Sequence, residues 1–201
     1  STAIYDTVLF DRVLAGGDTS EANQKILDLH KTVEENSQAI VEASGISIDT
    51  GLLRSHSGEY VTTSLESAEL IKVTANAFLS LKISFANSIA KLCDAAGADI
   101  TEVMSVVGSD KRIGKAFLNA GRGYGGGCFP KDVSGLISSA IRHGVDLPIM
   151  TASVDVNASM PSYIVEKVIE KYGALEGKDV AVLGLAFKSG TSDTRKSPAI
   201  K

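Results

Sequence analysis

A long amphipathic stretch between Glu66 and Ala96 constrains the fold of this chain more than any other feature. The T-x-x-E spacing of Thr63 and Glu66 predicts a capping box at its start, and Gly97 can end the helix. About 31 residues at 1.5 Å each give a helix of roughly 46 Å, so we expect it to pack on several neighbours or on a second subunit. Its apolar residues recur at the three- and four-residue steps of one helix face: Ile71, Ala75, Phe78, Leu79, Ile83, Ala86, Ile89 and Leu92.

Shorter apolar segments on both sides of this helix predict pieces of α/β structure. Residues 11–18 predict a buried strand that leads into a helix near residues 19–21, and residues 60–63 predict another short strand. Residues 178–187 form a continuous apolar run edged by glycines, which is typical of a buried parallel strand. Residues 36–60 are largely polar and are punctuated by Gly and Ser, so we expect a loop there.

Further helices are expected after the long one. Asp99 can cap a helix that runs to Val107, and another helix is expected from Asp132 to about His143. A helix begins at Pro148, and Pro161 is placed in the first turn of a separate helix through Tyr172. The predicted fold class is a mainly α centre built on one long helix, flanked by partial α/β pieces at both ends.

Composition argues against several classes of protein. The formal net charge of −4 disfavours a nucleic-acid surface, which is normally basic. No apolar run reaches the roughly 18 residues that cross a bilayer, and the N-terminus lacks a signal-peptide layout. The two cysteines suggest neither a disulfide framework nor a metal site, which fits a reducing cytoplasm. Cys93 lies among apolar residues of the long helix, and we expect it to be a small buried hydrophobe.

The sequence NAGRGYGGGCFPKD at residues 119–132 predicts an active-site loop. Five of the seven residues from 121 to 127 are glycine, so the backbone can approach a ligand without a Cβ atom in the way. The thiol of Cys128 follows at once, and Lys131 and Asp132 are close enough in sequence to affect its reactivity. We interpret Cys128 as a nucleophile that attacks an aldehyde carbon.

Two other segments carry candidate binding residues. Lys72 and Asn76 are four residues apart on one face of the long helix, where they either stabilise a developing oxyanion or form part of a solvated polar face. Residues 184–195 begin with a glycine turn and place Lys188 and Arg195 seven residues apart, which suits phosphate binding. No G-x-G-x-x-G directly follows a predicted strand and opens a helix, so the bare sequence has no dinucleotide fingerprint.

Four motifs, in this order, resemble the UDP-glucose/GDP-mannose dehydrogenase family of NAD-dependent nucleotide-sugar dehydrogenases. They are ESAELIKVTANAF at 66–78, RIG at 112–114, GYGGGCFPKD at 123–132, and GLAFK through RKSP within 184–198. The resemblance implies the end of a Rossmann NAD-binding domain at residues 1–64, a central helical dimerisation domain at 65–175, and the start of a Rossmann-like UDP-binding domain at 176–201. We therefore expect a fragment whose glycine fingerprint precedes residue 1.

The resemblance also assigns roles to individual residues. Cys128 matches the catalytic nucleophile, Lys72 and Asn76 match the groups that stabilise the oxyanion, and Asp132 matches the carboxylate that orients the hydrolytic water. Lys131 and Arg195 match NAD contacts. The substrate contacts that it implies are Phe117, Leu118, Asn119, Gly125, Phe187, Lys188 and Arg112, the last of which reaches the substrate of a neighbouring subunit.

The reaction implied by the resemblance is the four-electron oxidation of UDP-glucose to UDP-glucuronate with NAD, through a cysteine thiohemiacetal and thioester. The expected protein is a cytoplasmic homodimer joined through helix 66–96, with no metal, nucleic-acid or membrane partner. Within the family, the same set of catalytic residues also oxidises UDP-N-acetylmannosamine or GDP-mannose, so these substrates are alternatives. An alternative from another class is a dimerisation and substrate-loop module that cannot bind NAD, and the isolated fragment is expected to be inactive.

Overall fold

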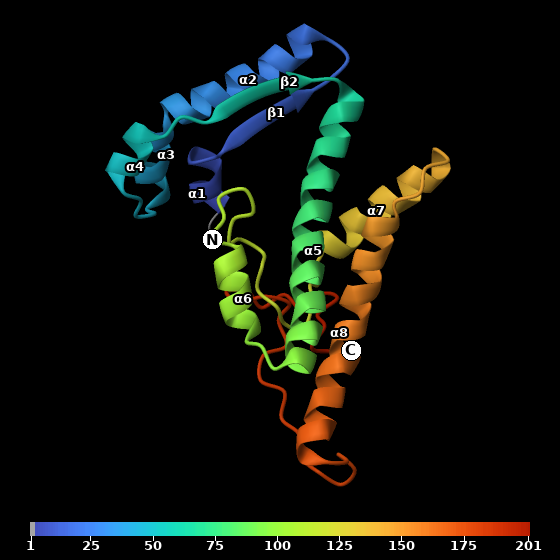
Figure 1. The fold of residues 1–201 in the computed structure, drawn as a ribbon. Coiled ribbons are helices and arrows are strands. Elements are labelled where there is room, and N and C mark those ends of the chain that lie inside the picture. The colour runs from blue at the N-terminus through green and yellow to red at the C-terminus, as the bar shows by residue number, and fades with distance from the viewer. Residues whose placement is uncertain (1–2) are drawn as a thin grey trace. The chain divides into compact units, whose positions relative to one another are not determined.

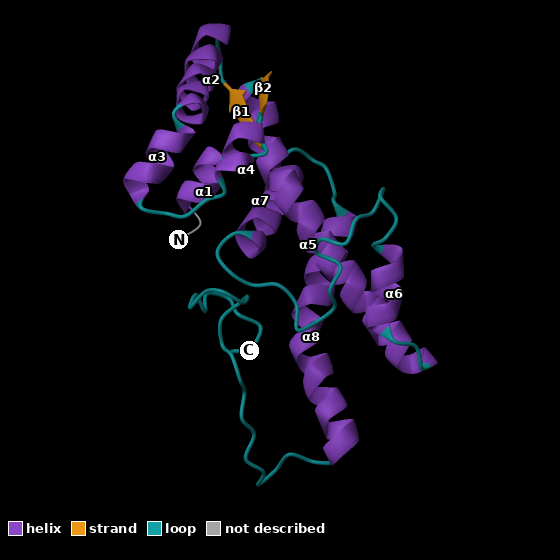
Figure 2. Ribbon diagram, turned by 90° about the vertical axis from the view of Figure 1, so that its left-hand side faces the viewer, coloured by secondary structure: helices purple, strands orange, loops and turns teal. Residues whose placement is uncertain are grey.

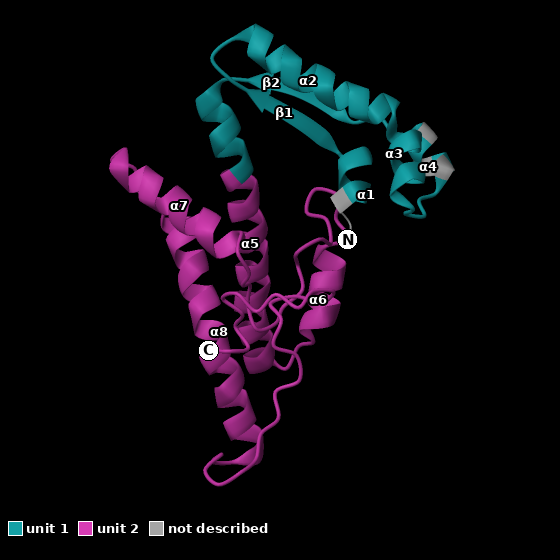
Figure 3. Ribbon diagram, turned by 180° about the vertical axis from the view of Figure 1, so that it is seen from behind, with its two compact units in different colours: residues 1–72 teal, residues 73–201 magenta. Residues whose placement is uncertain are grey.

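The computed structural model describes residues 3–201, with all of their side chains except those at positions 3, 50, 52 and 54. Contacts between Cα atoms divide the chain into two compact units, Ser1–Lys72 (unit 1) and Val73–Lys201 (unit 2), which are coloured separately in Figure 3. Figure 1 labels the elements in chain order. The predicted domain boundaries after residues 64 and 175 stay predictions.

Unit 1 is built around a parallel pair of short strands, drawn in orange in Figure 2. β1 (Arg12–Gly16) pairs with β2 (Glu59–Thr63), and Arg12 lies opposite Glu59. α2 (Ser20–Glu35) follows β1, and its Leu27 is buried against Val13 and Ala15 of the strand. The predicted first strand, the helix start near residues 19–21 and the second strand are therefore confirmed.

The prediction of a loop at residues 36–60 is wrong. This stretch contains α3 (Ser37–Ser44), α4 (Thr50–Ser55) and the start of β2. Val41 of α3 and Leu53 of α4 form a small core with Val8 of α1 (Ala3–Val8). Asp49 caps α4 by accepting a hydrogen bond from the Gly51 amide at 2.8 Å. Helices this short carry too few apolar residues to display a helical period, so the pattern resembles a loop.

α5 (Leu65–Ala96) confirms the predicted long helix and contributes residues to both units. Its start is capped differently from the prediction. The hydroxyl of Ser64, which directly precedes the helix, accepts a hydrogen bond from the Ser67 amide at 3.2 Å, so Ser64 and not Thr63 is the N-cap. The end is as predicted, because Gly97 has a φ of +73° that suits glycine.

The buried face of α5 in unit 2 is made of small residues, not of its large apolar ones. Ser80 and Ser84 are buried, whereas Phe78 and Leu92 are 59% and 62% exposed. The Ser84 hydroxyl donates to the Ser153 carbonyl oxygen at 2.7 Å, and the Ser153 hydroxyl donates to the Ser84 hydroxyl at 3.0 Å. Small side chains allow this close approach, so the apolar periodicity identified the helix but not its inward face.

The next two helices carry the loop with the thiol between them. α6 (Ile100–Val107) is capped, as predicted, by Asp99, which accepts from the Thr101 amide at 2.7 Å. α7 (Phe129–Arg142) begins earlier than the predicted Asp132, directly after Cys128. Proline at the start of α7 is compatible with a helix because the first N–H groups have no helical acceptor.

α8 (Pro148–Tyr172) is one continuous helix, so the prediction of two helices that meet near Pro161 is wrong. Proline lacks an N–H group and leaves the carbonyl four residues earlier, that of Asn157, without its helical donor. This single loss is tolerated because the neighbouring Met160 is buried at 3% exposure and holds the helix in unit 2.

Residues 173–201 contain no helix or strand, so the predicted buried strand at 178–187 is also wrong. Val182 and Leu183 in this run are 59% and 94% exposed. No neighbouring strand lies beside the run within the described residues, and apolar character alone cannot form a ladder. The helical centre and the N-terminal parallel pair still confirm the fold class. None of the helices in residues 3–201 is long and apolar enough to cross a membrane.

Candidate active site

Cys128 is the exposed cysteine of the chain, and it occupies the N-cap position of α7. Its carbonyl oxygen accepts the Asp132 amide at 2.8 Å, which closes the first turn of that helix. The N-terminus of a helix carries partial positive charge, so Cys128 lies at the positive end of α7. Cys93 is buried at 5% exposure, as predicted for a structural cysteine. The two cysteines therefore have opposite environments.

Asp132, one helical turn after the thiol, is 4% exposed, and its partners include Asn76 and Lys131. The side-chain amide of Asn76 on α5 donates to one carboxylate oxygen at 2.6 Å. The ammonium group of Lys131 lies 3.0 Å from the other oxygen. The structure thus brings together Asn76, Lys131 and Asp132, and the positive charge of Lys131 compensates the negative charge of the carboxylate. Lys72 belongs to unit 1, and its role at the oxyanion stays a prediction.

The glycines before Cys128 make room for the protein's own chain. A Cβ atom on Gly125 would lie 2.3 Å from the Lys196 carbonyl oxygen, and one on Gly126 would lie 2.8 Å from the Phe187 ring. Gly126 also has a φ of +83°, which disfavours other residues. The close approach predicted for a ligand is therefore occupied, at these two positions, by the C-terminal segment. Gly125 is buried, so its predicted substrate contact stays a prediction.

Tyr124 anchors the middle of the loop. Its backbone amide donates to the Asn157 side-chain oxygen at 2.7 Å, and its carbonyl accepts from the Asn157 amide at 3.1 Å. Burial raises the pKa of the Tyr124 hydroxyl, and hydrogen bonds with Ser80 and Ser153 partly oppose this effect. The Tyr124 ring meets Phe129 edge-on. This residue therefore fixes the loop to α8 and to the first turn of α7.

Arg195 reaches the cysteine from the C-terminal segment. Its guanidinium would contact a Cβ atom on Gly127 at 3.2 Å, immediately before Cys128. Hydrogen bonds to Asp193 raise the pKa of Arg195, and the charge of Cys128 adds a smaller increase. The same pairing lowers the pKa of Asp193. Arg195 is thus a cation next to the thiol loop, whereas the sequence analysis assigned it to phosphate and NAD binding.

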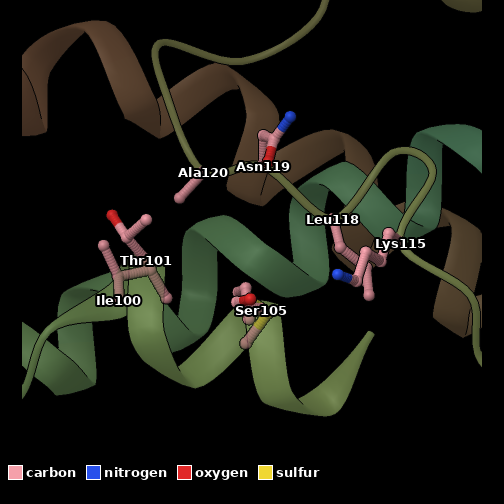
Figure 4. Close-up of a pocket in the computed structure, with 8 residues that line it drawn as sticks. Ile100, Thr101, Ser105, Lys115, Leu118, Asn119 and Ala120 are labelled. Atoms are coloured by element: carbon pink, nitrogen blue, oxygen red, sulfur yellow. The ribbon is translucent and has the colours of Figure 1, made fainter. Parts of the chain in front are cut away.

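The predicted substrate residues Leu118 and Asn119 border a cavity of about 310 Å³, shown in Figure 4. Thr101 and Ser105 of α6 line it opposite Lys115. Leu118 is 3% exposed and packs in a core cluster, so it is also a structural residue. Asn119 is exposed. The cavity is therefore a recess beside the loop with both apolar and polar lining.

Three of the remaining predicted residues are exposed, namely Phe117, Arg112 and Lys188, and Phe187 is half-buried. Phe117 is 41% exposed and has an unusual φ of +64°, a kind of strain that clusters at functional sites. Arg112 is paired with Asp110 at 2.6 Å, and its reach into a second subunit stays a prediction. The ammonium of Lys188 lies over the Phe187 ring, 5.6 Å from its centroid.

Sequence reasoning missed three residues that hold the loop. Asn87 accepts the Gly121 amide at 2.7 Å, Asn157 binds Tyr124, and Arg122 donates to two carbonyls of the C-terminal segment. An asparagine in an apolar helix and an arginine inside a glycine run are weak signals, because either is equally compatible with a solvated surface.

Residues 66–159 match the family described as "UDP-glucose/GDP-mannose dehydrogenase family, central domain". The chain is 41% identical over 199 residues to the UDP-glucose 6-dehydrogenase AglM of Haloferax volcanii, covering 99% of this chain and 42% of that protein. Its fold matches a UDP-glucose dehydrogenase of Pyrobaculum islandicum with a TM-score of 0.81 at 35% identity, over 98% of this chain and 40% of that one.

A UDP-D-ManNAc dehydrogenase of Pyrococcus horikoshii also matches, with a TM-score of 0.64 at 32% identity, over 75% of this chain and 36% of that one. The alignments with two curated relatives cover 99% of this chain. The chain spans only 38% and 42% of the length of those relatives. The matched central domain includes the long helix, the thiol and the buried carboxylate, and on this evidence the chain belongs to the UDP-glucose/GDP-mannose dehydrogenase family.

Proposed function

We propose that this chain is the thiol-bearing part of an NAD-dependent nucleotide-sugar dehydrogenase that oxidises UDP-glucose to UDP-glucuronate. The observation that carries the proposal is the exposed Cys128 at the start of α7, one turn before a buried carboxylate fixed by Asn76. A nucleophile at a helix N-terminus with a carboxylate close by suits covalent catalysis followed by hydrolysis.

The proposed chemistry uses the thiol for the second oxidation. The first oxidation converts the C6 alcohol to an aldehyde. The Cys128 sulfur then bonds to the aldehyde carbon, and the carbonyl oxygen gains a proton to give a thiohemiacetal. Loss of hydride and that proton leaves a thioester. Water attacks the thioester carbon, the carbon–sulfur bond breaks, and the thiolate leaves with the carboxylate product released.

Asp132 is proposed to orient the attacking water. Its carboxylate accepts a hydrogen bond from Asn76 and forms an ion pair with Lys131, and these contacts fix its orientation. A carboxylate held in one orientation can accept a proton of the attacking water from one direction. Over both oxidations, one alcohol, one water and two NAD⁺ give one carboxylate, two NADH and three protons.

NAD supplies the hydride acceptor when bound. The residues proposed to meet it are Lys131 and Arg195, whose side chains are 70% and 74% exposed. Arg195 lies against Gly127, next to the thiol. Exposed cations at this place fit a phosphate-bearing group, although each also has a carboxylate partner within the chain.

The proposed enzyme is a homodimer joined through α5. Phe78, Phe85 and Leu92 are seven residues apart, and all three are exposed. A seven-residue apolar repeat forms one seam on a helix, which suits packing against a second copy. Arg112 is proposed to reach the substrate of the partner subunit, whereas Phe187 and Lys188 are proposed to contact the UDP-sugar of their own subunit.

The substrate test compares UDP-glucose, UDP-N-acetylmannosamine and GDP-mannose on the full-length enzyme, with Cys93→Ser as the control for Cys128→Ser. We expect two NADH per UDP-glucose from the wild type and from Cys93→Ser, and no complete oxidation by Cys128→Ser. Preference for UDP-N-acetylmannosamine, which the Pyrococcus relative acts on by name, would replace the substrate assignment.

The same assay separates the enzyme from a non-catalytic module. We expect the 201-residue chain alone to reduce no NAD and a version extended at both ends to do so. If the extended protein binds neither NAD nor a nucleotide sugar, the chain functions as a dimerisation module and the proposal is wrong.

A further inference from the structure

The loop before Cys128 is held by the C-terminal segment 184–198, drawn in red in Figure 1. We propose that Arg122 is a positioning residue for the thiol, because it fastens this segment across the glycines that lead to Cys128. The inference rests on the proposed function only for its catalytic consequence. Its structural content is independent of any substrate.

Arg122 makes two hydrogen bonds to the segment. One guanidinium nitrogen donates to the Gly184 carbonyl at 3.1 Å, and another donates to the Ala186 carbonyl at 2.5 Å. No backbone amide of the described residues donates to either of these carbonyls. Arg122 is half-buried, and none of the ion pairs in the described part of the chain includes it. Both of these donors therefore serve the backbone of one segment.

The segment residues that Arg122 binds are connected to the thiol by a short series of contacts. Ala186 is followed by Phe187, whose ring lies against Gly126. The Gly126 amide donates to the Arg195 carbonyl at 2.8 Å, and the Phe187 amide donates to the Asp193 carbonyl at 2.9 Å, which closes the segment into a loop. Arg195 then covers Gly127, the residue before Cys128. Two arginines thus brace the glycine run, Arg122 from within it and Arg195 from the C-terminal segment.

Other parts of the glycine loop are held elsewhere. The Gly121 amide is bonded to Asn87 of α5, and the Tyr124 amide is bonded to Asn157 of α8. Only Gly126 depends on the segment for its amide acceptor among these three. If Arg122 fastens the segment, its removal should expose the Gly126 amide to hydrogen exchange, while the amides of Gly121 and Tyr124 remain protected from exchange. A general loosening of the unit would release all three.

The test measures amide hydrogen exchange by NMR on the 201-residue chain. For Arg122→Ala we expect the Gly126 amide to exchange about tenfold faster, the effect of losing two charge-assisted hydrogen bonds that are partly exposed. The amides of Gly121 and Tyr124 should keep their wild-type rates. Arg122→Lys retains a cation that can bond one carbonyl and should restore most of the Gly126 protection. Arg142→Ala, on the exposed end of α7, is the matched control.

Catalysis provides a second, separate readout in the full-length enzyme. Arg122→Ala should lower kcat for complete oxidation about tenfold, because the thiol is misplaced, and should raise KM for the nucleotide sugar by less than this factor, because Phe187 and Lys188 of the released segment are proposed sugar contacts. Arg122→Lys should recover most of kcat. An unchanged Gly126 rate, equal acceleration of all three amides, or unchanged kcat with a raised KM would overturn the positioning role. If the wild-type enzyme oxidises no nucleotide sugar, the proposed function fails while the exchange result still decides the fastening.

Discussion

Replacing Gly125 with alanine tests whether the glycines of the loop serve the protein's own packing. The new Cβ atom would lie 2.3 Å from the Lys196 carbonyl oxygen and 3.0 Å from the Pro198 Cδ atom. Ordinary contact begins at 3.4 Å. The carbonyl must therefore retreat by roughly 1 Å, because overlap at this range is strongly repulsive.

The expected free-energy cost of Gly125→Ala depends on the Lys196 backbone atoms that the new Cβ atom would meet. Overpacking costs about 1–3 kcal/mol in proteins, and a backbone atom cannot rotate aside as a side chain can. Lys196 already has a φ of +49°, which leaves it little freedom to adjust. We expect about 2 kcal/mol, relieved by detachment of segment 184–198, which corresponds to a roughly 30-fold larger detached population.

Limited trypsin digestion under native conditions measures this population, because cleavage follows the open state when reclosing is fast. Cleavage after Lys188, followed by mass spectrometry, should be about 30-fold faster in Gly125→Ala than in the wild type. Gly121→Ala is the matched control in the same loop, since nothing lies within 4 Å of its added Cβ atom. Equal cleavage rates in both variants and the wild type would refute the packing argument.

Three further results are expected. Asn76→Ala should lower the free energy of unfolding in urea by about 1–3 kcal/mol, because it removes a donor from the buried Asp132 carboxylate; an unchanged midpoint would exclude this support. Iodoacetamide at neutral pH should modify the exposed Cys128 at least about tenfold faster than the buried Cys93, and equal rates would contradict their assigned environments. Backbone hydrogen bonds from the first turn of α6 lower the pKa of Asp99 below its ordinary value of 3.8, so its cap should stabilise the fold above that value and lose this effect as the pH falls through the folded pKa. Asp99→Ala should therefore flatten the acid side of a plot of stability against pH, and an unaltered acid limb would argue against the cap.

The long helix was predictable because its signals are local. Apolar residues repeat over many turns, and Gly97 provides a stop that needs no tertiary partner. The same reasoning found Asp99 as a cap. It failed at α3 and α4, where the helices are too short to show a period and are stabilised by contact with Val8.

The site shows the same division between local and distant effects. The thiol and Asp132 were identifiable because they lie in one short sequence, one helical turn apart. The residues that hold them in place involve distant parts of the chain. Asn76 of α5 binds Asp132, Arg122 binds the backbone of residues 184–186, and Arg195 lies against Gly127. A glycine signals close approach but does not say whether a ligand or the protein's own chain approaches. Nothing local could have shown that residues 178–187 form no strand and that 178–185 are exposed.

The central claim is that Cys128 carries the sugar as a covalent intermediate. Its most direct test is to quench the full-length enzyme with acid during turnover of UDP-glucose and NAD⁺, then to weigh the peptides that contain each cysteine. We predict a nucleotide-sugar adduct on the Cys128 peptide, more of it in Asp132→Asn where hydrolysis slows, and none on the Cys93 peptide. Unmodified Cys128 in both enzymes, together with wild-type acid formation by Cys128→Ser, would contradict the account.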